Sequence, residues 1–352
     1  MPGPQPPLSM PALTRRELLC LAAGAVAWPA AAQAALGTER RQLFGSAAEL
    51  TLPAAASRQA AAEVWRGLAA MNAGWNAWKP GELSRLNQAF AQGRPAPVSA
   101  ALRQMIRQAA WLEQASDGCF NPAIGGLVAA WGFHADVLGP GPRPGAATLA
   151  RWREARPSLA QIRFDDDLAR SSNPRVQVDL GAYAKGVAID WALDRLQRHG
   201  IVDALLNLGG NLAASGAPAG RPWRVGVRDP HGPGLVATIE TQGREAVVTS
   251  GSYERSRLLD GQRCCHILDP LTGAPADAGP APALVSVTVV HPSAAFADAA
   301  ATALLVAGPL RWQAVARRLG VRQWLLIDSL GRRHTSAALA QRLQWPTADR
   351  PG

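Results

Sequence analysis

The stretch VDLGAYAKGVAID, residues 178–190, sets our expectation for the fold around it. It contains Lys185, one of only two lysines among the 36 Lys and Arg residues of the chain. The pattern predicts a strand at QVDL (177–180), a turn through Gly181 and a helix over about 183–199. A helix N-terminus presents free amides and the positive end of the helix dipole, so it suits phosphate groups. Lys185 is therefore a candidate contact for a phosphate or another acidic group.

The alternative for Lys185 is a surface position on an amphipathic helix. Its neighbours Ala184, Gly186 and Val187 are small or apolar, which counts against that alternative. The segment does not match the phosphate-binding pattern G-x-x-x-x-G-K-[ST], so it does not identify a nucleotide by itself.

Outside this stretch, apolar spacing predicts helices and alternating patterns predict strands. The stretches WRVGVRD, ATIETQG, AVVTSGS and LVSVTVVH are expected to form an antiparallel sheet. Because strands and helices are mixed without strict alternation, the pattern favours an α+β fold over a doubly wound one. The other expected elements are helices at 58–72, 98–116, 147–154, 294–307 and 309–319, and strands at 204–210 and 324–328.

Length and charge limit the protein class. The chain has 352 residues, which exceeds the usual single-domain size and predicts a two-lobed protein. The formal net charge is +10, but the arginines are scattered and no run of five cations occurs. Aromatic residues are not interleaved with a basic patch, so we expect no nucleic-acid partner.

The N-terminus predicts an export signal over residues 1–34. Arg15 and Arg16 precede a short apolar run, which favours the twin-arginine pathway and cleavage near Ala34. We therefore expect a bacterial periplasmic protein. Cys20 leaves a lipoprotein alternative open, and membrane association is expected only if that cysteine is lipidated. The odd count of Cys119, Cys264 and Cys265 does not build a disulfide framework.

The stretch FADAAATALLV, residues 296–306, places a carboxylate and a hydroxyl on one helix face. Asp298 and Thr302 are four residues apart, and oxygen ligands of this kind can hold a hard cation. The alternative is structural, with Asp298 as a helix cap and Thr302 bonded back to a carbonyl. Spacing alone does not decide between the two.

Three further stretches combine polar residues with turn chemistry. In HILDPLTG (266–273), His266 is either a proton shuttle or a core histidine beside a turn. VVTSGSYER (247–255) leads from a strand into a hydroxyl-rich loop, but its serine is not in the frame of a nucleophile elbow. LNLGGN (206–211) is a glycine turn that lets a ligand approach the backbone.

Taken in order, eight stretches resemble the FAD:protein FMN transferase family, also called ApbE-type flavin transferases. The resemblance covers roughly 43–330 and implies a transferase domain over 35–335, with a C-terminal tail over 336–352. It also implies two lobes of mixed and antiparallel sheets with helices, and a flavin cleft between the lobes. The eight stretches are LFGSAAEL, WKPGELSRLN, DGCFNPAIGGLVAAWGF, VDLGAYAKGVAID, LLNLGGN, VTSGSYER, HILDPLTG and SVTVVHPSAAFADAAATAL.

Matching positions then carry over the roles of the family. The resemblance implies Mg²⁺ ligands at the Asp298 carboxylate, the Thr302 hydroxyl and the carbonyls of Ala182 and Ala301. His266 would accept a proton near the reacting phosphate, with Asp269 orienting it. The implied contacts with FAD are Phe44, Trp78, Cys119, Phe120, Asn121, Asp179, Lys185 and Ile267. Departures from the family pattern are Phe44 for methionine, Gly81 for serine, Asn121 for aspartate and Gly126 for proline.

The resemblance implies Mg²⁺-dependent transfer of FMN from FAD to a threonine or serine hydroxyl of a partner protein, with release of AMP. The acceptors expected are flavin-carrying subunits of membrane redox complexes. Two alternatives remain open: an FAD pyrophosphatase that uses water instead of the hydroxyl, and a periplasmic flavin-binding protein without enzymatic activity. The same metal helix would serve the first alternative, whereas the second has no use for it.

Overall fold

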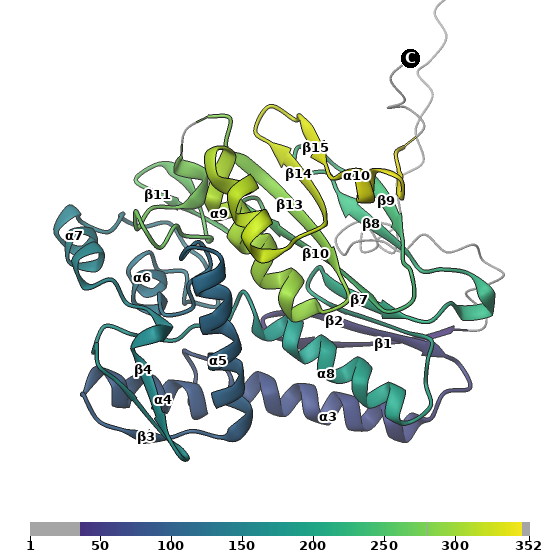
Figure 1. Ribbon diagram of the computed structural model, residues 1–352, viewed down its shortest axis with the longest axis horizontal. Helices are drawn as coiled ribbons and strands as arrows, with labels where there is room; N and C mark the ends of the chain where they lie inside the picture. The colour runs from purple at the N-terminus through teal and green to yellow at the C-terminus, as the bar shows by residue number, and fades with distance from the viewer. Residues whose placement is uncertain (1–35, 280, 347–352) are drawn as a thin grey trace, which may run out of the picture.

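A large antiparallel sheet forms the centre of the computed structural model, which describes residues 36–279 and 281–346 (Figure 1). Its strands follow the order β1-β2-β6-β7-β10-β13-β14-β15. They are β1 Leu36–Leu43, β2 Ser46–Pro53, β6 Ala204–Leu208, β7 Asn211–Ser215, β10 Glu245–Gly251, β13 Leu284–His291, β14 Gln323–Asp328 and β15 Arg333–Thr335.

Side chains along these strands alternate between two hydrophobic clusters. In β10, Ala246 and Val248 belong to the cluster on the helix side, whereas Val247 belongs to the cluster on the other face. In β13, Val289 and Val290 divide in the same way. Because successive side chains of a strand point to opposite faces, the sheet is buried on both sides.

Three helices cover the first face of the sheet (Figure 1). The helix α9 (Ala294–Leu319) packs on β10 and β13, α8 (Ala184–Arg198) packs against α9, and α3 (Arg58–Gly74) packs against α8. The two helical stretches expected at the end of the chain are both present, as one helix with a kink at Gly308 and Pro309. Within the described ranges, α9 alone is long and apolar enough to cross a membrane, and 61% of its most apolar window is buried in the fold.

A small sheet covers the second face of the large sheet. It contains β8 (Arg224–Arg228), β9 (Leu235–Glu240) and β16 (Leu343–Gln344). The sequence placed β8 and β9 in one sheet with β10 and β13, which is wrong, because they form this separate layer. Trp223 and Ile239 bury its inner side against Leu205 and Val247 of the large sheet.

Most of the remaining elements form the second lobe and its connections, whereas α10 packs on β14 of the large sheet. A third cluster, around Trp131, Phe133 and Leu268, joins α6 to the hairpin β11–β12. These elements are α4 Glu82–Ala91, β3 Ala96–Pro97, α5 Ala100–Ala115, α6 Gly125–Ala130, α7 Ala146–Ala155, β4 Ile162–Asp165, β5 Leu168–Ser171, β11 Ser256–Leu259, β12 Gln262–Cys265 and α10 Ala337–Ala340. Three short 3-10 turns, Leu159–Gln161, Pro218–Gly220 and Ala276–Ala278, complete the list. The mixture of antiparallel sheets and helices confirms the α+β prediction.

Two local expectations differ from the structure. Residues 177–180 are extended but are not a strand, because Val178 is held at both its amide and its carbonyl by the side chain of Asn87 (2.8 and 2.9 Å). Over 336–346, the segment expected as a tail packs on the domain. Leu339 is fully buried there, and Arg342 forms a buried ion pair with Glu245.

One departure from the family pattern has a steric reason. A Cβ at Gly81 would lie 2.5 Å from the carbonyl oxygen of Ala73 at the end of α3. Ser84 bonds the Gly81 amide instead (3.0 Å), so the turn into α4 is closed without a side chain at position 81. The crowded turn therefore explains why glycine stands where the family usually has serine.

Candidate functional site

The helices α8 and α9 meet at Gly186, where no side chain fits. A Cβ at Gly186 would lie 2.4 Å from the carbonyl oxygen of Ala294. One turn later, the Asp190 carboxylate accepts bonds from Ser293 Oγ (2.7 Å), Ala294 N (2.9 Å) and Ala295 N (3.0 Å), so it anchors the N-terminus of α9. Asp190 was not predicted from the sequence, although its four-residue spacing from Gly186 on one helix face is a signal for this role.

Asp298 lies on α9 beside this contact, with only 4% of its surface exposed. Burial raises the pKa of its carboxyl, while Lys185, Asn211 and the Gly186 amide favour the ionised form. The Gly186 amide lies 3.4 Å from Oδ2. The buried Nδ2 of Asn211 makes no hydrogen bond of standard geometry, although it lies close enough to affect the carboxylate. A carboxylate held this way is short of positive charge.

The other oxygen atoms expected to bind a cation belong to α9 and to the segment that precedes α8. The Thr302 hydroxyl lies one turn along α9 and hydrogen-bonds Ser250 Oγ of β10 at 3.1 Å. The Gly186 amide is directed to Asp298, and no donor among the described residues reaches the Ala182 carbonyl. Ala301 lies on α9 between the two side-chain ligands.

This donor set fits Mg²⁺, which is usually bound by one or two carboxylates and completed by substrate phosphates. Within residues 36–279 and 281–346, no group of three or more His, Cys, Asp or Glu side chains offers a separate metal cage. Of the residues expected as metal ligands, Asp298, Ala301 and Thr302 lie on one stretch of α9, and Ala182 precedes α8, whose Gly186 amide contacts Asp298.

His266 is held as a neutral imidazole with one free nitrogen. Its Nδ1 lies 3.1 Å from the carbonyl oxygen of Arg255, which can only accept, so Nδ1 carries the proton and donates. The backbone amide of His266 donates to the same carbonyl at 3.0 Å. Burial, together with the positive charges of Arg255 and Lys185, lowers the pKa of the imidazole to about 4. Nε2 is therefore unprotonated near neutral pH and available as a base.

Asp269 does not orient this imidazole, contrary to the expectation. Its carboxylate accepts bonds from the Leu271 amide (2.8 Å) and the Thr272 hydroxyl (3.1 Å) within its own turn. The physical reason is the Asp-Pro-x-Thr-Gly turn itself, whose free donors lie closer than the ring. The Arg255 carbonyl performs the orienting role instead.

Asp179 and Trp78 lie together at the start of α8. The Asp179 carboxylate accepts a bond from the Gly181 amide (2.8 Å) and one from the Trp78 indole. Burial raises the pKa of Asp179, while those bonds and the charge of Arg255 oppose the shift. The Trp78 ring lies 5.3 Å from the ring of His134. Phe44 lies at the β1–β2 turn, where its amide is held by a side chain of α3.

The stretch expected at the adenosine end presents few side-chain atoms. Cys119 and Phe120 are 1% and 3% exposed, and Phe120 packs 6.2 Å from the Tyr183 ring. Asn121 uses its amide within the lobe, donating to Pro157 and accepting from Ala123. Ile267 is 8% exposed. A ligand contact from Cys119 or Phe120 would therefore have to come from the backbone.

Arg255 was not among the expected site residues. Its guanidinium acts on both Asp179 and His266, and its one hydrogen bond, to the Ala135 carbonyl, is long at 3.4 Å. Its place in VTSGSYER, directly before the hairpin that ends at His266, is a signal that could have found it.

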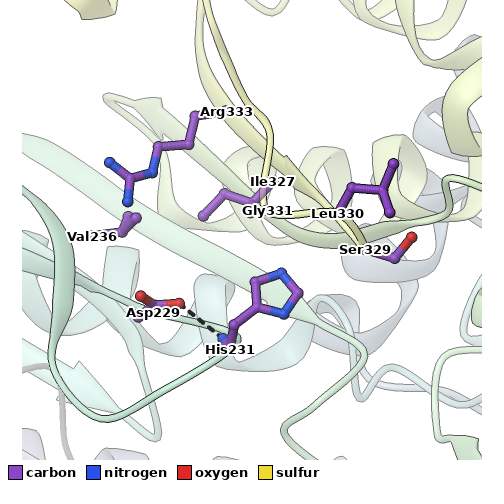
Figure 2. A pocket seen from close by; sticks show the side chains of 8 residues that line it. All are labelled: Asp229, His231, Val236, Ile327, Ser329, Leu330, Gly331 and Arg333. Carbon is purple, nitrogen blue, oxygen red and sulfur yellow. Dashed lines mark hydrogen bonds between the residues drawn. The ribbon is translucent and has the colours of Figure 1, made fainter. Parts of the chain in front are cut away.

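The pocket drawn in Figure 2 lies elsewhere. It has a volume of about 380 Å³ and is formed by the loops after β8 and β14. In it, Asp229 accepts a bond from the His231 amide at 2.8 Å. The complete lining is Asp229, His231, Val236, Ile327, Ser329, Leu330, Gly331 and Arg333, which includes no expected site residue. The candidate site is therefore assigned to the region of Asp298, Lys185 and His266 and not to this pocket.

Comparisons with known proteins agree with this geometry. The model of the ApbE family matches residues 44–325. A protein of Rhodobacter capsulatus called FAD:protein FMN transferase is 40% identical over 310 residues, covering 87% of this chain and 58% of that protein. A protein of the same name from Treponema pallidum is 34% identical, covering 74% of this chain and 75% of that protein.

Solved structures are similar over nearly their whole length. The ApbE protein of Thermotoga maritima superposes with a TM-score of 0.77 at 25% identity, covering 87% of this chain and 99% of that chain. The flavin transferase ApbE of Vibrio cholerae gives a TM-score of 0.74 at 28% identity, with the same coverage of 87% and 99%. By the family match, the curated relatives and the fold, the chain belongs to the ApbE family.

Proposed function

We propose that the chain is a Mg²⁺-dependent FAD:protein FMN transferase, which moves FMN from FAD to a threonine or serine hydroxyl of a partner protein and releases AMP. The name shared by its relatives supports this proposal. The observation that carries it is the set of groups around Lys185, whose charge acts both on the imidazole of His266 and on the buried carboxylate of Asp298. A neutral base, a free cation and a buried carboxylate suit substitution at phosphorus, which needs positioning and charge neutralisation.

In the proposed reaction, the acceptor oxygen forms a bond to the phosphorus of the FMN half of FAD. The P–O bond to the AMP half breaks, and AMP leaves with the bonding electron pair. The hydroxyl proton passes to Nε2 of His266, the nitrogen that the Arg255 carbonyl leaves free. Lys185, in the first turn of α8, would hold a phosphate oxygen beside that nitrogen.

The Asp298 carboxylate, the Thr302 hydroxyl and the carbonyls of Ala182 and Ala301 would hold Mg²⁺. When bound, the ion supplies positive charge that polarises the pyrophosphate and stabilises the leaving phosphate. The buried contact between α8 and α9 would keep these donors in place, since Asp190 fixes the first turn of α9.

We also propose that the chain acts in the periplasm after export by the signal at residues 1–34. These residues lie outside the part of the chain that the structure describes. The partner would be a flavin-carrying subunit of a membrane redox complex with an accessible target hydroxyl. A hydrolase that releases FMN and AMP would use the same base and metal ligands, so the acceptor must be present in the test.

The test is an in-gel flavin fluorescence assay. The chain from residue 35 is mixed with FAD, Mg²⁺ and a periplasmic flavoprotein subunit that carries an acceptor threonine, while AMP and free FMN are quantified in parallel. The proposal expects a fluorescent acceptor band and equimolar AMP, both lost with EDTA, and no band when that threonine is replaced. Free FMN and AMP without a labelled band would support the hydrolase, and bound, intact FAD would support a flavin carrier.

A further inference from the structure

Arg255 has a side chain without a structural task at the centre of the candidate site. It follows β10 and directly precedes β11, and its side chain is exposed. Its backbone carbonyl fixes His266 through two hydrogen bonds of 3.0 and 3.1 Å. The guanidinium itself makes one long bond of 3.4 Å, to the Ala135 carbonyl. The Arg255 backbone therefore positions the imidazole of His266, while most donors of the Arg255 guanidinium remain available to a ligand.

Arg257, two residues further on, shows what a structural arginine looks like in the same hairpin. Its Nη1 donates to the Trp131 carbonyl at 2.6 Å and its Nε donates to the Gly139 carbonyl at 2.9 Å. A Cβ at Gly132 would collide with that guanidinium. Arg257 therefore holds the loop over 131–139 in place, which Arg255 does not need to do.

The charges around His266 form an ordered series. Asp179 lies within the influence of Arg255, Arg255 and Lys185 both act on His266, and Lys185 also acts on Asp298. In the part of the chain that the structure describes, neither cation has a carboxylate within 4.0 Å. Two cations that lack a carboxylate partner therefore act on one neutral imidazole, which leaves the site short of negative charge.

We propose that the Arg255 guanidinium binds the pyrophosphate of FAD beside His266, together with Lys185. This inference rests on the proposed function, because it takes FAD as the substrate. A guanidinium presents a planar fork of donors that matches two phosphate oxygens, whereas an ammonium offers a point charge. The two cations would then both contact the pyrophosphate beside Nε2 of His266, with Lys185 also acting on Asp298.

Binding of the pyrophosphate by both cations has a consequence for the proton affinity of His266. Arg255 and Lys185 are the charged groups that act on His266, and both lower the pKa of its imidazole. A pyrophosphate bound by them adds negative charge and cancels part of that effect. The proton affinity of Nε2 therefore rises when the substrate is in place, which is when the acceptor hydroxyl must lose its proton.

The test compares Arg255→Ala, Arg255→Lys and the control Arg143→Ala. Arg143 is an exposed arginine whose guanidinium contacts Gln262 of the same hairpin, and its charge is not among those that act on His266. Affinity is measured without acceptor, by fluorescence titration with FAD and with riboflavin, which lacks phosphate. The acid limb of kcat/KM is measured by labelling at a series of pH values.

We expect Arg255→Ala to weaken FAD binding by about 10–100-fold, the scale of a hydrogen bond to a charged group, and to leave riboflavin binding unchanged. Arg255→Lys should restore part of the FAD affinity, and Arg143→Ala should match the unmodified chain. Without the Arg255 charge the pKa of His266 rises, so the acid limb of kcat/KM should move to higher pH. A purely structural role for Arg255 would not shift that limb.

Unchanged FAD affinity in Arg255→Ala, or an equal loss for FAD and riboflavin, would overturn the inference. An unmodified chain that binds FAD through Arg255 but labels no acceptor would refute the transferase and retain the phosphate contact. An unmodified chain that binds no FAD would overturn both.

Discussion

Replacing Gly186 with alanine should separate the two helices that carry the metal ligands. The new Cβ would lie 2.4 Å from Ala294 O and 2.6 Å from Ala294 C and Ala295 Cα, where ordinary contacts begin at 3.4 Å. All three atoms belong to the backbone of α9, so relief requires a shift of about 1 Å in a helix rather than in a side chain. Asp298 would move away from the first turn of α8.

The stability cost follows from two opposing terms. Overpacking of this kind costs about 1–3 kcal/mol. Alanine in a helix recovers about 0.5–1 kcal/mol relative to glycine. A net loss of about 1–2 kcal/mol should lower Tm by about 1–3 °C in a chain of 352 residues. Labelling should fall much further, by about 100-fold, because a displacement of about 1 Å in a catalytic constellation has that effect.

The matched control is Gly74→Ala at the end of α3. A Cβ at that position meets no atom within 4 Å, so the control should melt at or above the temperature of the unmodified chain and label normally. Thermal unfolding by circular dichroism and Mg²⁺ titration of the labelling rate are the measurements. If Gly186→Ala melts together with Gly74→Ala and labels within twofold of the unmodified chain, the close contact between α8 and α9 is not what positions the metal ligands.

Three further outcomes are expected. Asp298→Asn should reduce labelling by more than about 100-fold and abolish the Mg²⁺-dependent rise in Tm. It should not lower Tm in EDTA, because the carboxylate is buried and burial raises its pKa. A Mg²⁺-dependent Tm in that variant would contradict the ligand assignment. Arg342→Ala leaves the buried Glu245 charge unpaired and should cost about 3–5 kcal/mol in the free energy of unfolding by urea, with FAD affinity unchanged. Burial raises the pKa of Cys119 to about 11 and of Cys265 to about 12, so a thiol reagent at pH 8 should modify them only after denaturation, and rapid modification of the folded chain would disprove their burial.

Local spacing in the sequence was sufficient where the chemistry lies within one helix or one strand. The four-residue spacing of Asp298 and Thr302 placed both on one face of α9, and alternating stretches gave β10 and β13. The partners of a strand are chosen by residues distant in the sequence, so the separate sheet of β8 and β9 was not predictable from alternation. For the same reason residues 177–180 were taken for a strand, although their backbone bonds go to residues 122–125 and to the side chain of Asn87 rather than to a strand of a sheet.

Burial limited the prediction of individual contacts. Cys119 and Phe120 occupy motif positions, yet their side chains belong to the core, which a motif cannot show because it records order along the chain and not direction in space. Asp190 was missed for the opposite reason. It lies inside the quoted stretch, but its task becomes visible only when the N-terminus of α9, over a hundred residues later, is seen against it.

The choice of lysine at position 185 follows from where its charge must act. Lys185 influences Asp298 on α9 and His266 after β12, two groups on different elements, from the first turn of a helix whose next residue has no room for a side chain. A compact ammonium on a flexible stem can serve both directions, whereas the planar fork of an arginine would be committed to one orientation. Arg255 acts on His266 and Asp179 and is not among the groups that act on Asp298, so its fork can be committed to one phosphate. In a chain that otherwise uses arginine almost throughout, the single lysine of this site marks the place where a point charge is required.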